Sequence, residues 1–303
     1  MPQPLSQYGH DLKVGPYPRS VKGRKVTRTM SDSSLDIQSL FSLEGKVALV
    51  TGGSRGIGYM ITQGLLQAGA RVYISARNAR TCEHAAQELS AYGECMALPG
   101  DVTDPDSRRQ LCEQLEAMEP RLNILVNNAG TAWGENYKDF PESAFDKVMR
   151  VNVTAMFALT RDLTPLLEPA ATRDDPARVI NIGSMEGLHI PTVHGVGNYA
   201  YTASKAAVHH LTRHLAVELG SRQITVNAIA PGFFPSKMTD HVFTHRRKEI
   251  EGNSLLGRVG TAAEMAGIAT YLSGRAGAYT HGAIIPVDGG TSINHQHAII
   301  STA

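Results

Sequence analysis

Short runs of hydrophobic residues alternate with longer segments of helical periodicity between residues 46 and 290. The runs are rich in valine, isoleucine and leucine and lack polar alternation, as is typical of strands that helices cover on both faces. The predicted strands are 47–51, 71–75, 94–98, 124–127, 178–182, 224–229 and 284–287. The predicted helices are 56–67, 79–91, 107–118, 144–167, 201–219 and 262–272. This alternation predicts an α/β fold with a single doubly wound parallel-sheet domain of the Rossmann type.

The first 30 residues differ in composition from the rest of the chain. They contain six lysines and arginines, four prolines and one acidic residue, Asp11, and they lack the hydrophobic segment of a secretory signal. Such a segment does not bury enough apolar surface to fold. We therefore expect a disordered basic extension over residues 1–40 and one folded domain over residues 41–303. Import into an organelle through the extension is left open.

Composition excludes several classes of function. The net charge is +1 with 19% charged residues, so no overall field favours nucleic acid or an anionic membrane as a partner. No apolar stretch approaches the roughly 18 to 20 residues that a membrane-spanning helix needs. The three cysteines are too few and too scattered for a disulfide framework or a zinc site. We therefore expect a protein of a reducing compartment, the cytoplasm, with no membrane or nucleic-acid partner.

A glycine-rich turn, Thr51-Gly-Gly-Ser-Arg-Gly-Ile-Gly58, connects the first predicted strand to the first predicted helix. Glycines at this spacing allow a tight turn and let the backbone approach a pyrophosphate, which the N–H groups of the helix N-terminus then bind. The flanking strand and helix favour dinucleotide binding over a simple turn. The residues of this turn that we expect to contact the cofactor are Gly52, Ser54, Arg55, Gly56 and Gly58.

The end of the second predicted strand selects the nicotinamide cofactor. NAD-binding proteins place an acidic residue there for the ribose 2′-hydroxyl, whereas this chain has Arg77 and Asn78. The guanidinium groups of Arg55 and Arg77 suit a 2′-phosphate, which a carboxylate would repel. The alternative is that both arginines are solvated surface residues. We predict that the 41–303 domain binds NADP(H), with contacts from Arg55, Arg77 and Asn78.

Two further segments follow predicted strands at the same edge of the sheet. Asp101, followed by Val102, is placed to accept a hydrogen bond from the adenine amino group, to serve the N-terminus of the next helix, or both. Asn128, Ala129 and Gly130 follow the fourth strand, where small residues let a ribose lie close to the backbone. We predict that all five residues bind the cofactor.

A tyrosine and a lysine one helical turn apart, Tyr201 and Lys205, are the candidate proton-transfer pair. A neighbouring ammonium and the positive nicotinamide ring of the cofactor favour the phenolate, so we expect the tyrosine pKa to lie below its ordinary value near ~10. Ser184 follows a predicted strand, and its hydroxyl is placed to bind a substrate carbonyl oxygen. Asn152, in the long predicted helix, is placed to hold a water that links the lysine to solvent. A second tyrosine, Tyr199, is expected to precede the regular helix and to line the pocket.

Three histidines of the same predicted helix, His209, His210 and His214, include an i, i+4 pair, which is the spacing of a helical metal site. The glutamate of an HExxH motif does not accompany them, and Lys205 on this helix would repel a cation. We predict no metal site and assign these histidines to the surface or to an interface.

Together these motifs resemble the short-chain dehydrogenase/reductase superfamily, with its TGxxxGxG turn, NNAG segment and YxxxK pair, over roughly residues 43–290. The resemblance implies a seven-stranded Rossmann-type sheet and, often, a homotetramer. It implies a catalytic tetrad of Asn152, Ser184, Tyr201 and Lys205, of which the last two also bind the cofactor. The family's cofactor-binding positions match Ile57, Asp101, Asn128, Phe234 and Ser236.

Within the superfamily the chain is most similar to the β-ketoacyl reductases, in particular to the NADPH-dependent kind of rhamnolipid synthesis. The similarity is carried by residues 53–58, 68–72, 125–130 and 231–238. Two features depart from the family pattern: a longer interval between Ser184 and Tyr201, with extra residues near 192–198, and the basic extension. Because the longer loop borders the pocket, the resemblance leaves the acyl specificity open. Residues 233–257 are irregular and are predicted to form a substrate lid.

The leading hypothesis is an NADPH-dependent reductase that transfers hydride to a ketone, above all to a 3-oxoacyl thioester, in a homo-oligomer that is a tetramer or a dimer. A second hypothesis is a broad carbonyl reductase or alcohol dehydrogenase that acts on a secondary-metabolite or steroid-like ketone. A third, of another class, is a regulator that senses NADP(H) without turnover. The complete tetrad argues against the regulator, because a sensor does not need a proton donor.

Overall fold

The computed structural model describes residues 36–191, 195–236 and 240–294, and the side chains of 240–245 are outside the description. The chain divides into two units, Met1–Leu35 and Asp36–Ala303. Predictions for the first 35 residues therefore lie outside the described part. Residues 36–40, which we assigned to the extension, belong to the second unit, and its first helix is α1 (Ile37–Phe41).

A seven-stranded sheet forms the centre of this unit, and all of its neighbouring strands are parallel. The strand order is β3-β2-β1-β4-β6-β8-β9, so the order reverses between β1 and β4. The bounds are β1 (Val47–Thr51), β2 (Arg71–Ser75), β3 (Cys95–Ala97), β4 (Ile124–Asn127), β6 (Ala177–Ile182), β8 (Ile224–Pro231) and β9 (Ile284–Val287). A two-stranded antiparallel sheet joins β5 (Glu135–Asn136) to β7 (Val196–Gly197). The predicted doubly wound α/β fold is confirmed.

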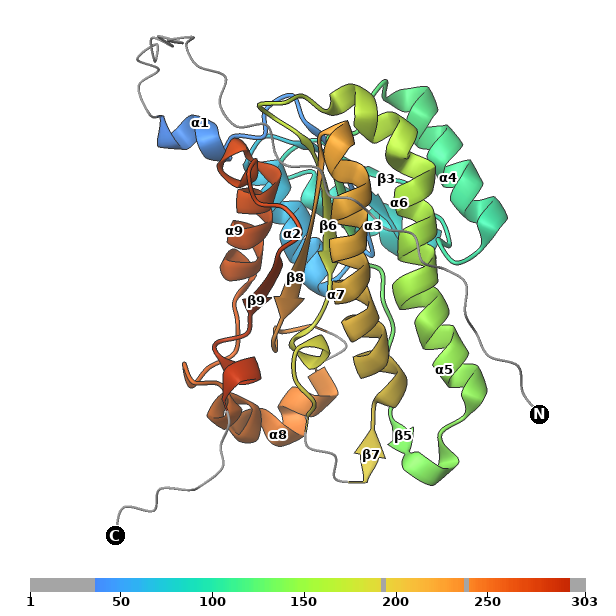
Figure 1. Ribbon diagram of the computed structural model, residues 1–303, viewed down its shortest axis with the longest axis vertical. Helices are drawn as coiled ribbons and strands as arrows, with labels where there is room; N and C mark the ends of the chain where they lie inside the picture. Colours follow the sequence, from blue (N-terminus) through green and yellow to red (C-terminus); the bar gives the residue numbers. More distant parts are fainter. Residues whose placement is uncertain (1–35, 192–194, 237–239, 295–303) are drawn as a thin grey trace, which may run out of the picture. The chain divides into compact units, whose positions relative to one another are not determined.

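Helices cover both faces of the seven-stranded sheet (Figure 1). One face packs α2 (Gly56–Gln67), α3 (Ala79–Leu89) and α9 (Ala262–Ser273) against alternate strand residues such as Ala48 and Val50. The other face packs α4, α6 and α7 against the intervening residues. The remaining helices of the described chain are α4 (Pro105–Met118), α5 (Glu142–Met149), α6 (Ala155–Leu167), α7 (Tyr199–Leu219) and α8 (Asp240–Asn253).

The hydrophobic runs identified most strands well, because both faces of the central strands such as β1 and β4 are buried. The predicted bounds of β1, β2, β4 and β9 are those of the structure. The predicted helix 144–167 is correct in its extent but is interrupted by a π-helical turn at Arg150–Thr154. Helix α7 begins at Tyr199, so our expectation that this tyrosine precedes the helix is wrong.

The irregular region 233–257 contains α8, which is kinked at Arg246. This helix was not predicted because its hydrophobic residues do not form a continuous stripe. Strands β5 and β7 were also not predicted, since each is only two residues long and pairs with a distant segment.

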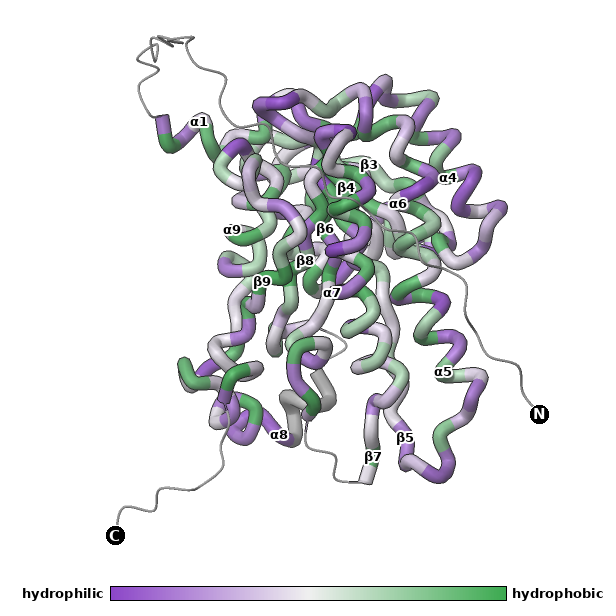
Figure 2. Tube along the Cα trace, viewed as in Figure 1, coloured by the Kyte–Doolittle hydropathy of each residue, from purple (hydrophilic) through white to green (hydrophobic). Residues whose placement is uncertain are grey.

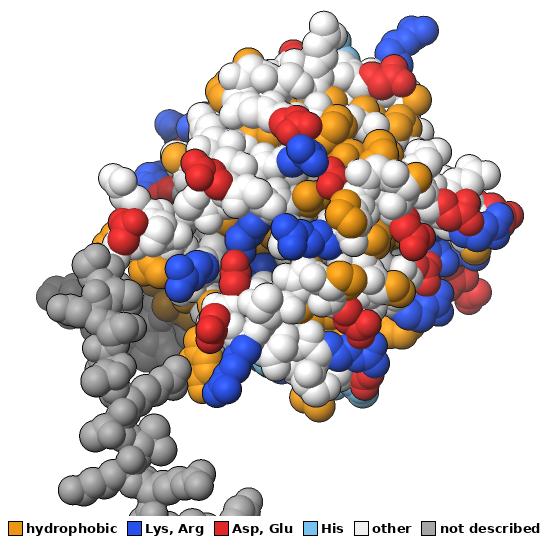
Figure 3. Space-filling view, turned by 90° about the horizontal axis from the view of Figure 1, so that it is seen from above, with side chains coloured by type: hydrophobic (Ala, Val, Ile, Leu, Met, Phe, Trp, Pro, Cys, Tyr) orange, Lys and Arg blue, Asp and Glu red, His pale blue; other side chains and the backbone are white. Residues whose placement is uncertain are grey.

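Hydropathy and charge follow the layered arrangement. Hydrophobic residues concentrate in the central strands, whereas hydrophilic residues follow the outer helices such as α4 (Figure 2). The end of the molecule at which the strands begin carries basic and acidic side chains side by side (Figure 3). Ion pairs there include Lys46–Asp175, Arg178–Asp175 and Arg71–Glu119. Within the described ranges, no helix is both long and apolar enough to cross a membrane.

Candidate active site

The predicted site residues gather where the parallel strands end, at the lower end of the molecule in Figure 1. The glycine turn follows β1, residues 128–130 follow β4, Ser184 follows β6, and residues 232–236 follow β8. The reversal of strand order between β1 and β4 opens a crevice at this edge, which is where open α/β sheets bind ligands.

The glycine turn is held in a conformation that only small residues permit. Gly52 has a φ of +66°, in the left-handed region. A Cβ atom on Gly58 would lie 2.3 Å from the Gly52 carbonyl oxygen and 2.5 Å from Asn128 Nδ2. Asn128 Nδ2 donates to the carbonyl oxygens of Thr51 (2.9 Å) and Gly52 (3.1 Å). The Asn128 side chain therefore ties the turn to the end of β4, and its contact with the cofactor stays a prediction.

The start of α2 has the features of an anion site. Its N-cap residue, Arg55, makes no side-chain cap hydrogen bond, so its side chain leaves the first N–H groups of the helix uncapped. Arg55 and Arg77 are exposed, and among the described residues neither forms an ion pair. Asn78 caps α3 by accepting a hydrogen bond from Thr81 N at 2.9 Å. This cradle of backbone N–H groups and unpaired guanidinium groups fits the phosphates of NADP(H).

Asp101 has a local partner in the structure. Its Oδ1 accepts hydrogen bonds from the backbone N (2.9 Å) and the hydroxyl (2.6 Å) of Thr103. The N-cap residue of α4 is Asp104, but Asp101 contacts the same helix start through its backbone, whose N donates to Ser107 Oγ at 2.8 Å. Val102 is buried in the core, which leaves its backbone as the part that can face the cofactor.

Phe234 and Ser236, both in the segment after β8, differ in the direction of their side chains. Phe234 is only 2% exposed, and its ring fills the space beside Gly260, so its side chain belongs to the core. Ser236 lies against the glycine turn: its Cβ is 3.1 Å from the position of a Cβ on Gly56. The structure thus brings Ser236 to the predicted pyrophosphate site. Ile57 is partly buried and packs against the core.

Asn152 is buried in the π-helical turn, where its amide joins two chain segments. Its Oδ1 accepts from the backbone N of Thr131 at 2.9 Å, and its Nδ2 donates to the Thr131 carbonyl at 3.0 Å. Nδ2 also donates to Ser204 Oγ at 2.9 Å, and Ser204 Oγ donates to the carbonyl of Tyr201 at 2.7 Å. Asn152 therefore fixes the chain after β4 to helix α7. The predicted water link to Lys205 stays a prediction.

Tyr201 and Lys205 face one another on α7. Lys205 Nζ lies 5.5 Å from the centroid of the Tyr201 ring and donates to the carbonyl of Ile182, at the end of β6, at 2.7 Å. Lys205 is 6% exposed, and burial lowers the pKa of its ammonium to about 8. Gly130, without a side chain, leaves room beside the ammonium.

The protein groups around Tyr201 raise its pKa, which is opposite to the direction that we expected from Lys205; the effect of the nicotinamide ring stays a prediction. Burial raises the pKa to about 12, and repulsion from Glu186 adds to the rise, whereas a hydrogen bond with Ser184 opposes it. Desolvation of the phenolate is thus the largest cause of the raised pKa, and the tyrosine holds its proton at neutral pH.

Ser184 begins a 3₁₀ turn, η4 (Met185–Gly187), directly after β6. Its Oγ accepts from the backbone N of Glu186 at 3.2 Å. Its backbone N lies 3.4 Å from His209 Nε2, to which it donates. His209 is 4% exposed and fills the space beside Gly183 and Gly187, and burial lowers its pKa to about 4. The assignment of His209 to the surface or an interface is therefore wrong, whereas His210 and His214 are exposed in this chain.

Tyr199 has an aromatic rather than a catalytic environment. Its ring makes edge-to-face contacts with Tyr137 (5.6 Å between centroids) and Phe140 (5.5 Å), and it packs against Gly197. The ring thus anchors the start of α7 to the segment after β5.

Three residues of the site were not found from the sequence. Thr51 Oγ1 accepts from the backbone N–H groups of Asn128 and Ala129 at 3.0 Å, which aligns the ends of β1 and β4. Thr131 acts through its backbone, which no sequence pattern reveals. Ser204 adjoins Lys205, and its spacing of three residues from Tyr201 was a signal that could have identified it.

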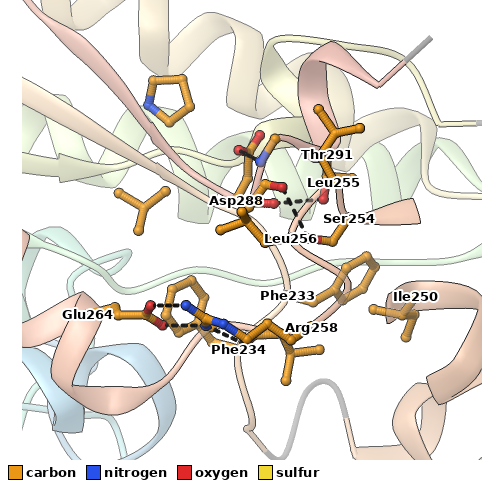
Figure 4. A pocket seen from close by; sticks show the side chains of 16 residues that line it. Phe233, Phe234, Ile250, Ser254, Leu255, Leu256, Arg258, Glu264, Asp288 and Thr291 are labelled. Carbon is orange, nitrogen blue, oxygen red and sulfur yellow. Dashed lines mark hydrogen bonds and ion pairs between the residues drawn. The ribbon is translucent and has the colours of Figure 1, made fainter. Parts of the chain in front are cut away.

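A cavity of about 480 Å³ lies between the end of α8 and the end of β9 (Figure 4). Its apolar wall consists of Phe233, Ile250, Leu255, Leu256, Val259 and Val287. An ion pair between Arg258 and Glu264 lies at one side. The cavity also includes Thr291 of η7 (Thr291–Ile293), a turn that packs near η4. The predicted lid thus forms one wall of an apolar cavity beside the Ser184 turn.

Comparison with known proteins gives consistent results. A family model described as short chain dehydrogenase matches residues 46–247. The rhamnolipids biosynthesis 3-oxoacyl-[acyl-carrier-protein] reductase of Pseudomonas aeruginosa is 51% identical over 253 residues, which are 82% of this chain and 97% of that protein. The galactitol 2-dehydrogenase (L-tagatose-forming) of Cereibacter sphaeroides is 35% identical and covers 86% of this chain and 100% of its own length.

Among solved structures, the Pseudomonas aeruginosa RhlG/NADP active-site complex has a TM-score of 0.81 and 49% sequence identity. It covers 84% of this chain and 99% of its own. The chain therefore belongs to the short-chain dehydrogenase family of oxidoreductases.

Proposed function

We propose that this protein is an NADPH-dependent reductase of a 3-oxoacyl thioester. The observation that carries the proposal is the convergence of Ser184, Tyr201 and Lys205 at the end of β6, beside a cradle that fits NADP(H). The most similar relative reported above is a 3-oxoacyl-[acyl-carrier-protein] reductase, which supports the choice of substrate class. The regulator hypothesis has no support, because the family is one of enzymes and the tetrad is complete.

The cofactor is assigned to the glycine turn and the two arginines. The N-terminus of α2 would hold the pyrophosphate, and the guanidinium groups of Arg55 and Arg77 would hold the 2′-phosphate. Lys205, beside Gly130, would hold the nicotinamide ribose. When bound, NADPH supplies a hydride to the carbonyl carbon.

Tyr201 supplies the proton. Because its pKa is about 12, the hydroxyl is protonated at neutral pH and is ready to donate to the carbonyl oxygen as negative charge develops there. The Ser184 hydroxyl, held by the Glu186 backbone N–H, is placed to donate a second hydrogen bond to the same oxygen. Lys205, with a pKa of about 8, is mostly cationic at neutral pH and stabilises the tyrosinate that remains.

The apolar cavity supports an acyl substrate. Its phenylalanine, leucine and isoleucine side chains offer an apolar surface, where a hydrocarbon chain gains free energy by leaving water. The cavity reaches the neighbourhood of the Ser184 turn through η7, which packs near η4. The galactitol 2-dehydrogenase is also 35% identical to this chain. A broader carbonyl reductase is therefore the second candidate function.

We also propose a homo-oligomer that works in the cytoplasm. Strand β9 lies at the edge of the sheet and its Pro286 is exposed. Phe157 (41% exposed) and Val217 (85% exposed) present apolar surface on α6 and α7. These surfaces support contacts between copies of the chain. The named relatives are bacterial and give no support to organelle import.

The substrate assignment is tested with a panel of ketones, with turnover followed as NADPH oxidation. We expect acetoacetyl thioesters, and longer 3-oxoacyl thioesters in particular, to have the highest kcat/KM, because the apolar cavity binds the chain. Turnover confined to steroid-like or sugar ketones would show the second candidate to be correct. Tight NADPH binding without turnover of any ketone would favour a sensor.

Replacement of Arg77 by aspartate should lower kcat/KM for NADPH far more than kcat/KM for NADH. The change removes a partner of the 2′-phosphate and adds a negative charge that repels it. The measurement is kcat/KM for both cofactors. Arg173→Asp is the matched control, because Arg173 is an exposed arginine in the loop before β6, at the opposite end of the strands. A wild-type preference for NADH would refute the assignment.

Replacement of Tyr201 by phenylalanine should reduce kcat by roughly 10²- to 10⁴-fold, the usual contribution of general acid catalysis. The affinity for NADPH, measured by fluorescence titration, should change little. Tyr199→Phe is the matched control: it retains the aromatic contacts with Tyr137 and Phe140 and should retain most activity. The reverse result would show that the site is wrongly assigned.

Light scattering at micromolar concentration should give the mass of a dimer or a tetramer. The reason is that the exposed edge strand and the apolar residues of α6 and α7 are stabilised by burial in an interface. Phe157→Glu should shift the measured mass distribution toward smaller oligomers or monomers if α6 forms part of the interface between subunits. A wild-type monomer at this concentration would contradict the proposal.

A further inference from the structure

Glu186 lies between the turn that contains Ser184 and the helix that carries Tyr201 and Lys205. Glu186 is the second residue of turn η4, two positions after Ser184, and its backbone N donates to the Ser184 hydroxyl. Its carboxylate is partly buried and accepts a short hydrogen bond from Asn198 Nδ2 at 2.5 Å. The residue therefore contacts the serine through its backbone and a second segment through its side chain.

That second segment is the start of α7. Asn198 is the N-cap residue of the helix, and its carbonyl accepts from the backbone N–H groups of Tyr201 (2.9 Å) and Thr202 (3.1 Å). Asparagine at this position usually caps the helix with its side chain, but here the side chain makes no cap hydrogen bond. The amide instead bonds to Glu186. The Glu186–Asn198 contact thus joins the turn of the serine to the first turn of the tyrosine helix.

The charge of Glu186 also acts on the tyrosine. Burial raises the pKa of Glu186, whereas the hydrogen bond from Asn198 and the proximity of His189 oppose this rise. The negative charge of Glu186 in turn raises the pKa of Tyr201.

Turn η4 packs against α7, β8 and η7. Among the described residues, α7 brings Tyr201, Lys205 and His209 toward this turn, and neither β8 nor η7 contains a titratable side chain. Within its own segment, His189 bonds to the Met185 carbonyl at 3.0 Å. Glu186 is therefore the acidic group that acts on Tyr201 in the described site.

We propose that Glu186 is a positioning residue of this active site, which ties the Ser184 turn to the start of α7 through its hydrogen bonds with Ser184 and Asn198. The inference rests on the proposed role of Tyr201 as the proton donor. Glu186 also has an electrostatic role, because its negative charge acts on the Tyr201 hydroxyl. Neither the glycine turn nor the YxxxK pair predicts this residue.

Glu186→Gln separates the two roles, because glutamine keeps an oxygen that accepts from Asn198 but carries no charge. Alcohol oxidation with NADP⁺ requires the tyrosinate, so its rate rises as the pH passes through the pKa of Tyr201. Removal of a nearby negative charge lowers that pKa, and the midpoint of the profile should fall by on the order of one pH unit. An unchanged midpoint would overturn the electrostatic role.

Glu186→Ala and Asn198→Ala test the structural contact. Both remove the hydrogen bond, and we expect each to lower kcat for reduction by roughly 10- to 100-fold with little change in the KM for NADPH, because the reacting groups lose their alignment. Glu186→Gln should restore most of the kcat lost in Glu186→Ala. Asn198→Ala keeps the charge, so its oxidation midpoint should remain that of the wild type.

Two controls make failure of this inference distinguishable from failure of the proposed function. If Tyr201→Phe is inactive but Glu186→Ala has wild-type kcat and Glu186→Gln has the wild-type midpoint, the inference is wrong and the proposed function stands. If Tyr201→Phe is active, Tyr201 is not the proton donor. The proposed mechanism is then wrong, and the inference on Glu186 falls with it. NADPH titration of every variant shows that the fold is intact.

Discussion

The burial of one ammonium group, that of Lys205, is the constraint on which the rest of the site depends. A buried charge is costly unless it is hydrogen-bonded, and the Ile182 carbonyl, at the end of β6, accepts one of its protons. That bond fixes the register between α7 and the central sheet. Nζ also lies 3.9 Å from the position of a Cβ on Gly130, where the absence of a side chain leaves space for a ribose. The cost of burial appears as the lowered pKa of about 8, close enough to neutrality for the group to remain mostly charged.

The surrounding elements bring other groups to this ammonium. The π-helical segment directs the Asn152 amide toward Thr131 and Ser204. An uninterrupted α-helix would present this amide in another direction. On the other side, His209 occupies the volume that side chains at Gly183 and Gly187 would need. These contacts over-determine the position of α7. Such redundancy suits a site whose groups must stay aligned within about 0.5 Å.

The sequence predicted what is local and periodic. The bounds of β1, β2 and β4 were correct because a strand covered on both faces is a continuous hydrophobic run. Those of β9 were also correct, although this edge strand is only partly buried. The π-helical turn was not predictable, since its cause is a long-range contact of Asn152 rather than a break in the hydrophobic period. Phe234 shows a related limit: a family position identifies the residue but not whether its side chain or its backbone faces the ligand, and here the ring is in the core.

The direction of the Tyr201 pKa shows why the chemistry of a site needs its burial as well as its motif. From the sequence, a lysine four residues away predicts stabilisation of the phenolate. The structure adds desolvation and a carboxylate, Glu186, and both act in the opposite direction. Desolvation is the largest cause, so the phenol keeps its proton until the pH is far above neutrality. A protonated tyrosine beside a serine hydroxyl is suited to giving a proton to a carbonyl oxygen. In such a site the lysine acts mainly on the tyrosinate that reduction leaves behind.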